Sequence, residues 1–357
     1  YGNEARDTKM SVTPTMELPR QGRFAEAQYF WGSAVINRDR AVRKDLLYIH
    51  GSSGSGKTTL LQYIYERADA DLAHLSRPNR AWASSICMLA VTFNSNTGIT
   101  SFDLRLIRDG MFISPIIVRL LFAQQSQMQS FDTFCEAMEA AYDEGIINKL
   151  DLGNLSWMFA TFGMQPDQPV MLLVDELVKL EQTMVKNGSS LQAAEAAVDN
   201  VRSALCREMD SLKPLQVVFS SLSTKPMDAE TLRSHRAVLR IGLPTLTGKQ
   251  SEVLISPHIP PGGLRHNAAA NFNDRKLTSA WLASMAGGHP RTIEEICREL
   301  QTVKMIFTSS DIVHNVVSKM VKRYAHQLAR YPWRLFLMVL AGDKVTLRTP
   351  VEDGIDI

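Results

Sequence analysis

The apolar residues of the chain gather in five short runs, and segments with helical spacing separate several of them. The runs are DLLYIH (45–50), SICMLAVTF (85–93), PVMLLVDE (169–176), PLQVVFSS (214–221) and AVLRIGL (237–243). One helical pattern runs from Lys57 to about Ala70, and a longer one covers residues 190–212. Strands that alternate with helices are typical of a parallel sheet covered by helices on both faces. The pattern therefore predicts an α/β fold with five parallel strands.

Other stretches follow different patterns. Residues 100–168 contain helix-like segments but no obvious strand, which predicts a helical insertion in the core. After Pro244, a loop rich in Pro, Gly and Asn (256–274) leads to two helices broken at GGHP (287–290), where Gly suits a helix stop and Pro a helix start. The expected domains are a polar N-terminal arm or linker at 1–28, a core at 29–245 with its insertion at about 100–168, a helical lid at 246–302 and a C-terminal helical segment at 303–357.

Composition narrows the class of protein without pointing to a partner. With 357 residues, 45% of them hydrophobic, the chain can bury a substantial core in one large or two smaller domains. Its net charge of +2 does not indicate a nucleic-acid or membrane surface. The longest suggestive apolar run, LFLMVLA (335–341), is far shorter than the roughly 18 residues of a membrane-spanning helix.

Cysteine usage and the first residue bear on the compartment and on processing. The four cysteines lie far apart with no CxxC spacing, which favours a reduced, intracellular compartment: Cys87, Cys135, Cys206 and Cys297. Three of them fall in predicted helices or strands and are expected in the apolar core. The sequence opens at Tyr1, with no initiator Met and no signal-peptide pattern. We therefore expect a processed piece or part of a longer chain.

The most specific motif is GSSGSGKT (51–58), a complete GxxxxGK[ST] phosphate-binding loop directly after the first apolar run. Its glycines let the backbone wrap a phosphate chain, Lys57 reaches the β- and γ-phosphates, and Thr58 offers a hydroxyl to Mg²⁺. A helix beginning there would place its positive end under the phosphates. A chance match in a turn is the alternative, against which the preceding strand and following helix argue. The expected nucleotide-binding residues are Gly51, Ser52, Ser53, Gly54, Ser55, Gly56, Lys57, Thr58 and Thr59.

Two carboxylates end the third apolar run. Ligands of open α/β sheets bind at the carboxyl ends of the strands, so Asp175 and Glu176 are expected to face the loop. Asp175 suits the hydration shell of Mg²⁺, and Glu176 suits the orientation and deprotonation of an attacking water. The alternative is an Asp-Glu pair that only begins a surface loop.

Further polar residues are candidates for contact with the γ-phosphate. The fourth run ends in Ser220 and Ser221, which either touch the phosphate or the water, or are ordinary turn residues. Arg291 and His289, at the start of the second lid helix, either reach the phosphates or lie on a solvated helix end. Additional candidates for a charge-stabilising arginine finger are Arg119, Arg233, Arg236 and Arg240.

The expected base is adenine. NKLD (148–151) fits the NKxD pattern that selects guanine in GTPases, but it follows a helical stretch and precedes the acidic strand, so we interpret it as a chance match. Three aromatic residues just before the first strand, Tyr29, Phe30 and Trp31, either supply a stacking surface for the base or are ordinary core residues.

The last helical stretch has a basic side, which is either a solvated helix face or a surface for a nucleic-acid or acidic partner. Its members are Lys319, Lys322, Arg323, His326, Arg330 and Arg334. Aromatic interleaving is limited to Tyr324, Tyr331 and Trp333.

Taken in order, GSSGSGKT, VMLLVDE, the polar-tipped LQVVFSS and GGHPRTIEEI resemble the motifs of the AAA+ and STAND group of P-loop ATPases, over about residues 28–302. Within that group, VTFNS (91–95), SPIIVRLLFA and VMLLVDELVKL are similar to the Crinkler and retrotransposon hot spot proteins of oomycetes and trypanosomatids. Two departures argue against a ring-forming motor. The acidic strand lies further from the loop than in a compact AAA+ module, and the first sensor lacks the frequent Asn.

The broad resemblance implies a P-loop NTPase sheet in the order 5-1-4-3-2, with ATP and Mg²⁺ as ligands. It implies Lys57 and Thr58 on phosphates and metal, Asp175 on the metal, Glu176 as catalytic base, Ser220 or Ser221 in the first sensor and Arg291 in the second. The narrower resemblance implies a protein acting inside cells, cytoplasmic or nuclear, including a secreted effector inside host cells.

Two functions from different classes follow. The first is Mg-dependent ATP binding and hydrolysis in a regulatory AAA+/STAND-like module that couples nucleotide state to the conformation of a lid or partner domain. The alternative is a nucleotide-binding scaffold with little turnover that recruits protein or nucleic-acid partners. Self-association is compatible with both functions, and neither function involves a membrane partner. A kinase is disfavoured because Glu176 suits activation of water.

Overall fold

The computed structural model describes residues 23–38, 43–51, 54–94, 97–124, 130–212, 214–221, 236–259 and 275–302, and six positions from Ile312 to Lys319. The chain divides into two compact units after Pro244. Unit 1 holds the sheet, and unit 2 is helical wherever it has regular structure among the described residues.

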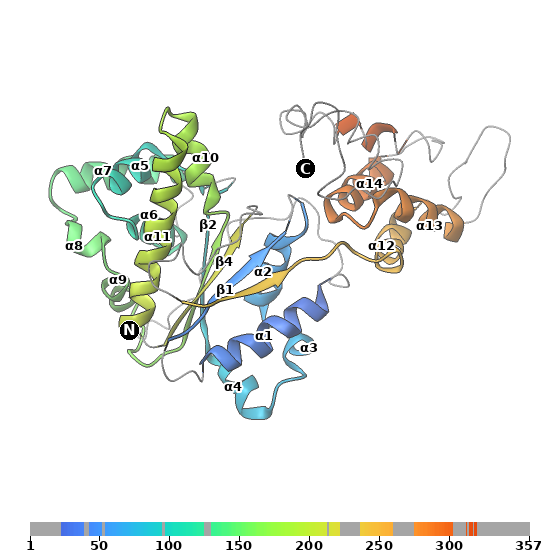
Figure 1. Cartoon of the computed structure of the whole chain (residues 1–357), viewed down its shortest axis with the longest axis horizontal. Coiled ribbons are helices and arrows are strands. Elements are labelled where there is room, and N and C mark those ends of the chain that lie inside the picture. The colour runs from blue at the N-terminus through green and yellow to red at the C-terminus, as the bar shows by residue number, and fades with distance from the viewer. Residues whose placement is uncertain are drawn as a thin grey trace, which may run out of the picture. The chain divides into compact units, whose positions relative to one another are not determined.

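Unit 1 is built on one sheet of five parallel strands (Figure 1). The strands are β1 (Leu46–His50), β2 (Cys87–Thr92), β3 (Val170–Asp175), β4 (Leu215–Ser221) and β5 (Val238–Gly242). Their order, β2-β3-β4-β1-β5, confirms the expected order 5-1-4-3-2, which counts from the opposite edge. Because β4 lies between β1 and β3, the ends of these three strands meet at one edge of the sheet.

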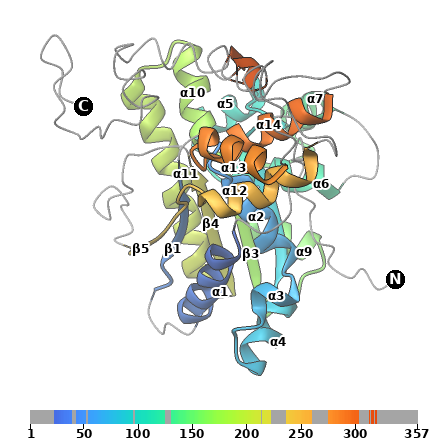
Figure 2. The same cartoon turned by 90° about the vertical axis from the view of Figure 1, so that its right-hand side faces the viewer.

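Helices cover both faces of this sheet, as predicted (Figure 1 and Figure 2). One face packs against α1 (Phe24–Arg38), α2 (Lys57–Glu66), α3 (Asp69–Leu72) and α4 (Arg77–Ser85). Alternate strand residues point to opposite faces. Leu47 and Ile49 of β1 therefore join this core, whereas Leu46 and Tyr48 join the core on the other face.

The second face carries the helices between β2 and β4. They are α5 (Ser101–Arg108), α6 (Ser114–Gln124), α7 (Phe131–Asp143), α8 (Lys149–Leu152), α9 (Leu155–Thr161), α10 (Val178–Lys186) and α11 (Leu191–Ser211). The described residues from 97 to 161 form helices and turns without a strand. The sequence patterns did not predict α4 or α10, because both are short helices beside strongly patterned segments.

The N-terminal boundary differs from the expectation. Residues 24–28 were expected in a polar arm, but they form the first turns of α1. Ala27 is fully buried, and so are Phe30 and Trp31 further along the helix. This apolar face packs against the sheet, which makes the segment part of the core; residues 1–22 lie outside the described part of the chain.

Unit 2 contains α12 (Gly248–Ile255), the 3₁₀ turn η3 (Ser256–His258), α13 (Arg275–Ala286) and α14 (Pro290–Thr302). The predicted helix break at GGHP is present, with Gly287 and Gly288 at φ +57° and +71°. A Cβ on Gly288 would lie 2.0 Å from the carbonyl oxygen of Leu246, so the site requires glycine. Helix α12 was not predicted; its start is a capping box between Thr247 and Gln250.

Some sequence-based expectations lie outside the described residues, namely the loop at 260–274 and most of the helical stretch at 311–340. Within the described part, no helix combines the length and apolar character needed to cross a bilayer. All four cysteines are buried and free, as their spacing led us to expect.

Candidate nucleotide-binding site

The phosphate-binding motif forms the turn between β1 and α2. Gly51 follows the strand, and α2 begins at Lys57. Gly54 and Gly56 have φ angles of +75° and +90°, a region that L side chains rarely adopt, so these two positions need glycine. The strand, glycine-rich turn and helix therefore follow one another as the motif requires. Ser52 and Ser53 lie outside the described residues.

Lys57 reaches back across this turn. Its Nζ donates to the carbonyl oxygen of Gly51 at 2.9 Å, and its side chain is only 4% exposed. Burial lowers the pKa of the Lys57 ammonium to about 8, although the carboxylates of Glu176 and Asp175 oppose the shift. A buried cation thus lies inside the loop, close enough to both carboxylates to interact with their charge.

Asp175 connects three elements at the carboxyl edge of the sheet. Thr58 Oγ1, in the first turn of α2, donates to Asp175 Oδ2 at 3.0 Å. The Ser220 hydroxyl of β4 donates to Asp175 Oδ1. The carboxyl group is almost fully buried, and this burial raises its pKa, opposed by the same two hydrogen bonds. Three residues that the sequence assigned separately to loop, acidic strand and polar strand tip therefore form one cluster.

Two members of this cluster suit a magnesium ion. Mg²⁺ prefers hard oxygen ligands and usually takes one or two carboxylates together with phosphate oxygens and water. The Thr58 hydroxyl and the Asp175 carboxylate supply oxygens of this kind 3.0 Å apart, next to the phosphate-binding loop. The residues present therefore fit the metal.

Glu176 has an unusual backbone. It follows β3 directly and has φ of +55°, one of two non-glycine residues with positive φ in the described part of the chain. Such a conformation costs roughly 1 kcal/mol or more and is often found at functional sites. Its carboxylate acts electrostatically on Lys57, which places it on the loop side of the strand end.

The structure distinguishes the two serines at the tip of β4. Both are buried, and Ser220 is the one whose hydroxyl contacts Asp175. Neighbouring residues on a strand face opposite ways, so Ser221 has a different environment, paired in register with His50 of β1. A hydroxyl contact with the γ-phosphate remains a prediction for both.

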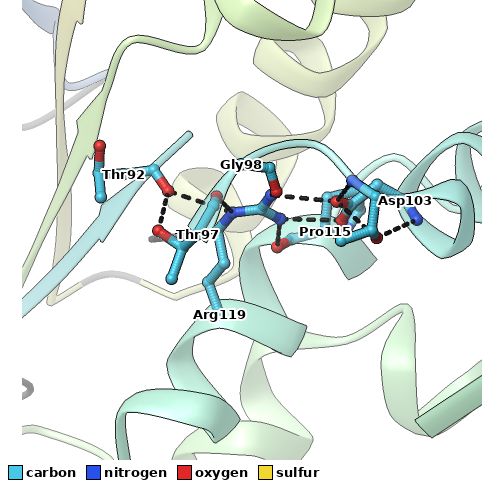
Figure 3. Close-up of polar contacts among 7 residues, drawn as sticks. Thr92, Thr97, Gly98, Asp103, Pro115 and Arg119 are labelled. Atoms are coloured by element: carbon cyan, nitrogen blue, oxygen red, sulfur yellow. Dashed lines mark hydrogen bonds and ion pairs between the residues drawn. The ribbon is translucent and has the colours of Figure 1, made fainter. Parts of the chain in front are cut away.

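Arg119 is not available as an arginine finger (Figure 3). It is 2% exposed and pairs with the fully buried Asp103 at 2.8 Å. Its remaining hydrogen bonds go to the carbonyl oxygens of Thr92, Thr97, Gly98 and Pro115. Every guanidinium nitrogen is engaged, and rings of Phe93 and Phe131 lie 4.1 and 4.8 Å from its Cζ. The residue fastens α6 to the end of β2.

Two other finger candidates are also misplaced. Arg236 is buried and donates to the carbonyl oxygens of Lys44 and Cys206 and to Asp210. Lys44 precedes β1, so Arg236 lies at the opposite end of the sheet from the loop. Arg240 lies within β5, opposite Tyr48, and not at the strand tip. Arg233 lies outside the described residues.

The lid residues belong to unit 2. Arg291 forms an ion pair with Glu294 at 3.6 Å, and His289 Nδ1 lies 3.3 Å from Thr292 Oγ1. Both contacts are local to the start of α14. The expected contact of Arg291 and His289 with phosphates stays a prediction.

The remaining candidates take structural positions. Phe30 and Trp31 are fully buried, so of the three aromatic residues proposed for base stacking only Tyr29 is exposed. In NKLD, Asn148 caps α8 and forms a capping box with Asp151, a local role in the insertion. Of the basic cluster, Lys319 alone is described, and it pairs with Glu299.

Arg23 also lies at this site, although no sequence pattern points to it. Its Nη2 donates to the carbonyl oxygen of Ser55, inside the phosphate-binding loop, at 2.5 Å. A single arginine some thirty positions before the loop carries no spacing signal by itself. Only the packing of α1 beside the loop reveals it.

Comparisons with known proteins identify similar folds only. No protein-family model and no curated protein matches the chain. Similar solved structures include PCH-2 of C. elegans (10% identity, 83% of this chain and 68% of that chain, TM-score 0.44). Others are the ORC1 protein of Aeropyrum pernix in complex with DNA (13%, 92% and 72%, TM-score 0.44) and Drosophila ORC bound to DNA (14%, 94% and 72%, TM-score 0.38). With TM-scores below 0.5, these similarities add nothing to the sheet order and loop geometry described above.

Proposed function

We propose that the chain binds ATP with Mg²⁺ and hydrolyses it, as a regulatory module of the AAA+/STAND type. The observation that carries this proposal is the cluster of Thr58 with the buried residues Lys57, Asp175 and Ser220, which joins the phosphate-binding loop to the acidic strand. A loop alone would bind a phosphate. The adjacent carboxylates add the groups that a hydrolytic site needs.

In this proposal the loop amides and Lys57 bind the phosphate chain, and the Lys57 ammonium stabilises the charge that develops during transfer. Thr58 and Asp175 hold the metal, which, when bound, supplies charge neutralisation at the phosphate oxygens. Glu176 orients the attacking water and accepts its proton, since its carboxylate directly follows β3 and interacts with the charge of the Lys57 ammonium in the loop. Ser220 or Ser221 contacts the γ-phosphate or the water.

The regulatory part of the proposal concerns unit 2. Helices α12 to α14 would act as the lid at 246–302, with Arg291 and His289 reaching the phosphates, and the nucleotide state would set the conformation of this lid or of a partner domain. Glu294, the partner of Arg291, also pairs with Arg298, so it would keep a counter-charge if Arg291 turned to a phosphate. The narrower likeness to Crinkler and retrotransposon hot spot proteins, with its intracellular setting, rests on the sequence segments alone.

The test is phosphate release from ATP and from GTP with Mg²⁺, with nucleotide binding measured in parallel. Glu176→Gln should keep binding and lose turnover, and Lys57→Ala should weaken binding. Lys186→Ala is the matched control, because Lys186 is an exposed lysine in the last turn of α10. It should behave as the unaltered chain does.

Two outcomes would change the proposal. If the unaltered chain binds ATP but releases no more phosphate than Glu176→Gln, a nucleotide-binding scaffold that recruits protein or nucleic-acid partners is the better account. If GTP is bound and turned over in preference to ATP, adenine specificity is wrong while the hydrolytic site stands.

A further inference from the structure

The side chain of Arg23 is buried against the phosphate-binding loop. Arg23 directly precedes α1, and its backbone carbonyl accepts a hydrogen bond from the N–H of Ala27 at 3.0 Å. Arg23 is only 4% exposed, and its guanidinium reaches the phosphate-binding loop. A Cβ built on Gly56 would lie 3.5 Å from Arg23 Nε, so the guanidinium packs closely on the loop.

Three acceptors hold this guanidinium in place. Nη2 donates to the carbonyl oxygen of Ser55 at 2.5 Å, and Nη1 donates to the carbonyl oxygen of Pro244 at 2.8 Å. The Glu26 carboxylate lies 3.4 Å from Nη1. Pro244 is the last residue of unit 1, so one side chain touches both the loop and the end of the unit. A planar fork of donors can hold two separate carbonyls in this way, whereas a lysine ammonium lacks the fork.

The bond to Ser55 fixes the orientation of a peptide group inside the loop. In a trans peptide the C=O of one residue and the N–H of the next point in opposite directions, and the described residues contain no cis peptide. With the Ser55 oxygen held by Arg23, the N–H of Gly56 must point away from Arg23. Gly56 has φ of +90° and no side chain, so its own conformational preference does little to hold this plane.

The direction of the Gly56 N–H matters because loop amides are the groups that cradle phosphates in this motif. A donor that is already oriented does not have to be ordered when the ligand binds, and such preorganisation increases affinity. Without the hydrogen bond from Arg23, the Ser55–Gly56 peptide group would sample several orientations.

We propose that Arg23 is a positioning residue of the nucleotide site, which acts by fixing the Ser55–Gly56 peptide so that its N–H is ready to bind phosphate. This inference rests on the proposed function of the loop. Arg23 itself contacts the outer side of the loop through a carbonyl oxygen, and it touches no reacting atom.

The experiment compares Arg23→Met and Arg23→Lys with Arg38→Met as control. Arg38 is the arginine at the other end of α1, where it donates to Asn79 and stacks on Trp82, away from the loop. A fluorescent ATP analogue gives Kd, phosphate release gives kcat, and thermal unfolding without nucleotide gives stability. We expect Kd to rise about tenfold in Arg23→Met, because the Ser55–Gly56 peptide must then be ordered when the phosphate binds.

The expected pattern separates positioning from structural support. Arg23→Met should raise Kd while kcat at saturating ATP changes much less, and Arg38→Met should leave Kd within about twofold. Arg23→Lys keeps the charge but lacks the fork, so we expect it to bind ATP more weakly than the unaltered chain. A purely structural role would lower the unfolding midpoint and leave the Kd of the folded protein unchanged.

Several results would overturn the inference. A Kd in Arg23→Met within twofold of that of the unaltered chain contradicts the inference. An unchanged Kd in Arg23→Lys also contradicts it, because a positive charge without the planar fork would then be enough for binding. If Arg23→Met does not fold, the Kd of Arg23→Lys tests the inference instead. Glu26→Gln is then the control, because it removes the charge beside Arg23 and keeps the contacts of Arg23 with the carbonyl oxygens of Ser55 and Pro244. Failure of the unaltered chain to bind ATP contradicts the proposed function itself, whereas binding that survives Arg23→Met contradicts only the role of Arg23.

Discussion

Thr58 Oγ1 lies 3.0 Å from Asp175 Oδ2, a hydrogen bond that joins the start of α2 to the end of β3 across 117 positions of the chain. It places the two proposed metal ligands side by side. The same carboxylate also accepts a hydrogen bond from Ser220, so its position is fixed from two directions. These two hydrogen bonds therefore hold the carboxylate in one orientation at the end of β3.

Asp175→Asn should abolish Mg²⁺-dependent turnover while leaving the fold intact. An asparagine amide fills the same space and still accepts the Thr58 bond, but it lacks the charge that holds a divalent cation. We expect phosphate release to fall by about a hundredfold or more, with nucleotide binding in EDTA little changed. A Mg²⁺ titration of turnover and a thermal unfolding curve provide the check. Turnover that persists with an unshifted Mg²⁺ midpoint would contradict the assignment of the metal ligand.

ATP affinity should fall as the pH rises above about 8. Burial lowers the pKa of Lys57 to about 8 in the nucleotide-free protein, so the ammonium that attracts phosphate is lost above that pH. A bound polyphosphate raises this pKa again, and binding above pH 8 must therefore take up a proton. Calorimetric titrations in two buffers between pH 7 and 9.5 would measure both effects. Lys57→Arg, whose guanidinium stays charged, should bind with little pH dependence in this range; an equal slope in that variant would refute the role of Lys57.

Glu176→Gly should be more stable than Glu176→Ala by about 1 kcal/mol. Both variants lose the proposed catalytic carboxylate, so both should be inactive. They differ in that alanine must still adopt the φ of +55°, a left-handed conformation that costs an L residue roughly 1–2 kcal/mol and glycine almost nothing. Urea unfolding of the two variants tests this. Equal stability would mean that the strand end relaxes when Glu176 is replaced.

Arg119→Met should destabilise unit 1 by about 3–5 kcal/mol, because it leaves the fully buried Asp103 without its counter-charge. The double variant Asp103→Asn/Arg119→Met should lose less free energy of unfolding than the two single variants lose together, since the two side chains act as a pair. Arg202→Met is the control: its partner Asp199 is 39% exposed, and we expect a loss below about 1 kcal/mol. If Arg119→Met unfolds at the same urea concentration as Arg202→Met, the network in Figure 3 contributes little to stability.

Local patterns in the sequence were sufficient for much of the fold. The five apolar runs became the five strands, and the loop at 51–58 formed the turn between a strand and a helix. The break at GGHP also appeared where glycine and proline required it. These features are encoded by neighbouring residues: apolar runs bury strands, and glycine adopts backbone angles that other residues avoid.

Partners between distant residues depended on tertiary structure. The local sequence around Arg119 does not distinguish it from other arginines, and its role follows from the packing of α6 against β2. For Phe30 and Trp31 the sequence left base stacking and the core open, and the packing of α1 on the sheet makes both core residues. Residues 24–28 were misassigned for the same reason. The local sequence around a residue does not specify which distant residue it will contact.

The sequence by itself determined which residues are candidates for phosphate and metal binding, because a phosphate-binding loop and an acidic strand end are recognisable from spacing alone. The tertiary structure decided which side chains share the site. Strand order and register bring Ser220 onto Asp175, and the packing of α1 beside the loop brings Arg23 onto Ser55. Such contacts join residues far apart in the chain, and their geometry is set by the folding of the whole sheet with its helices.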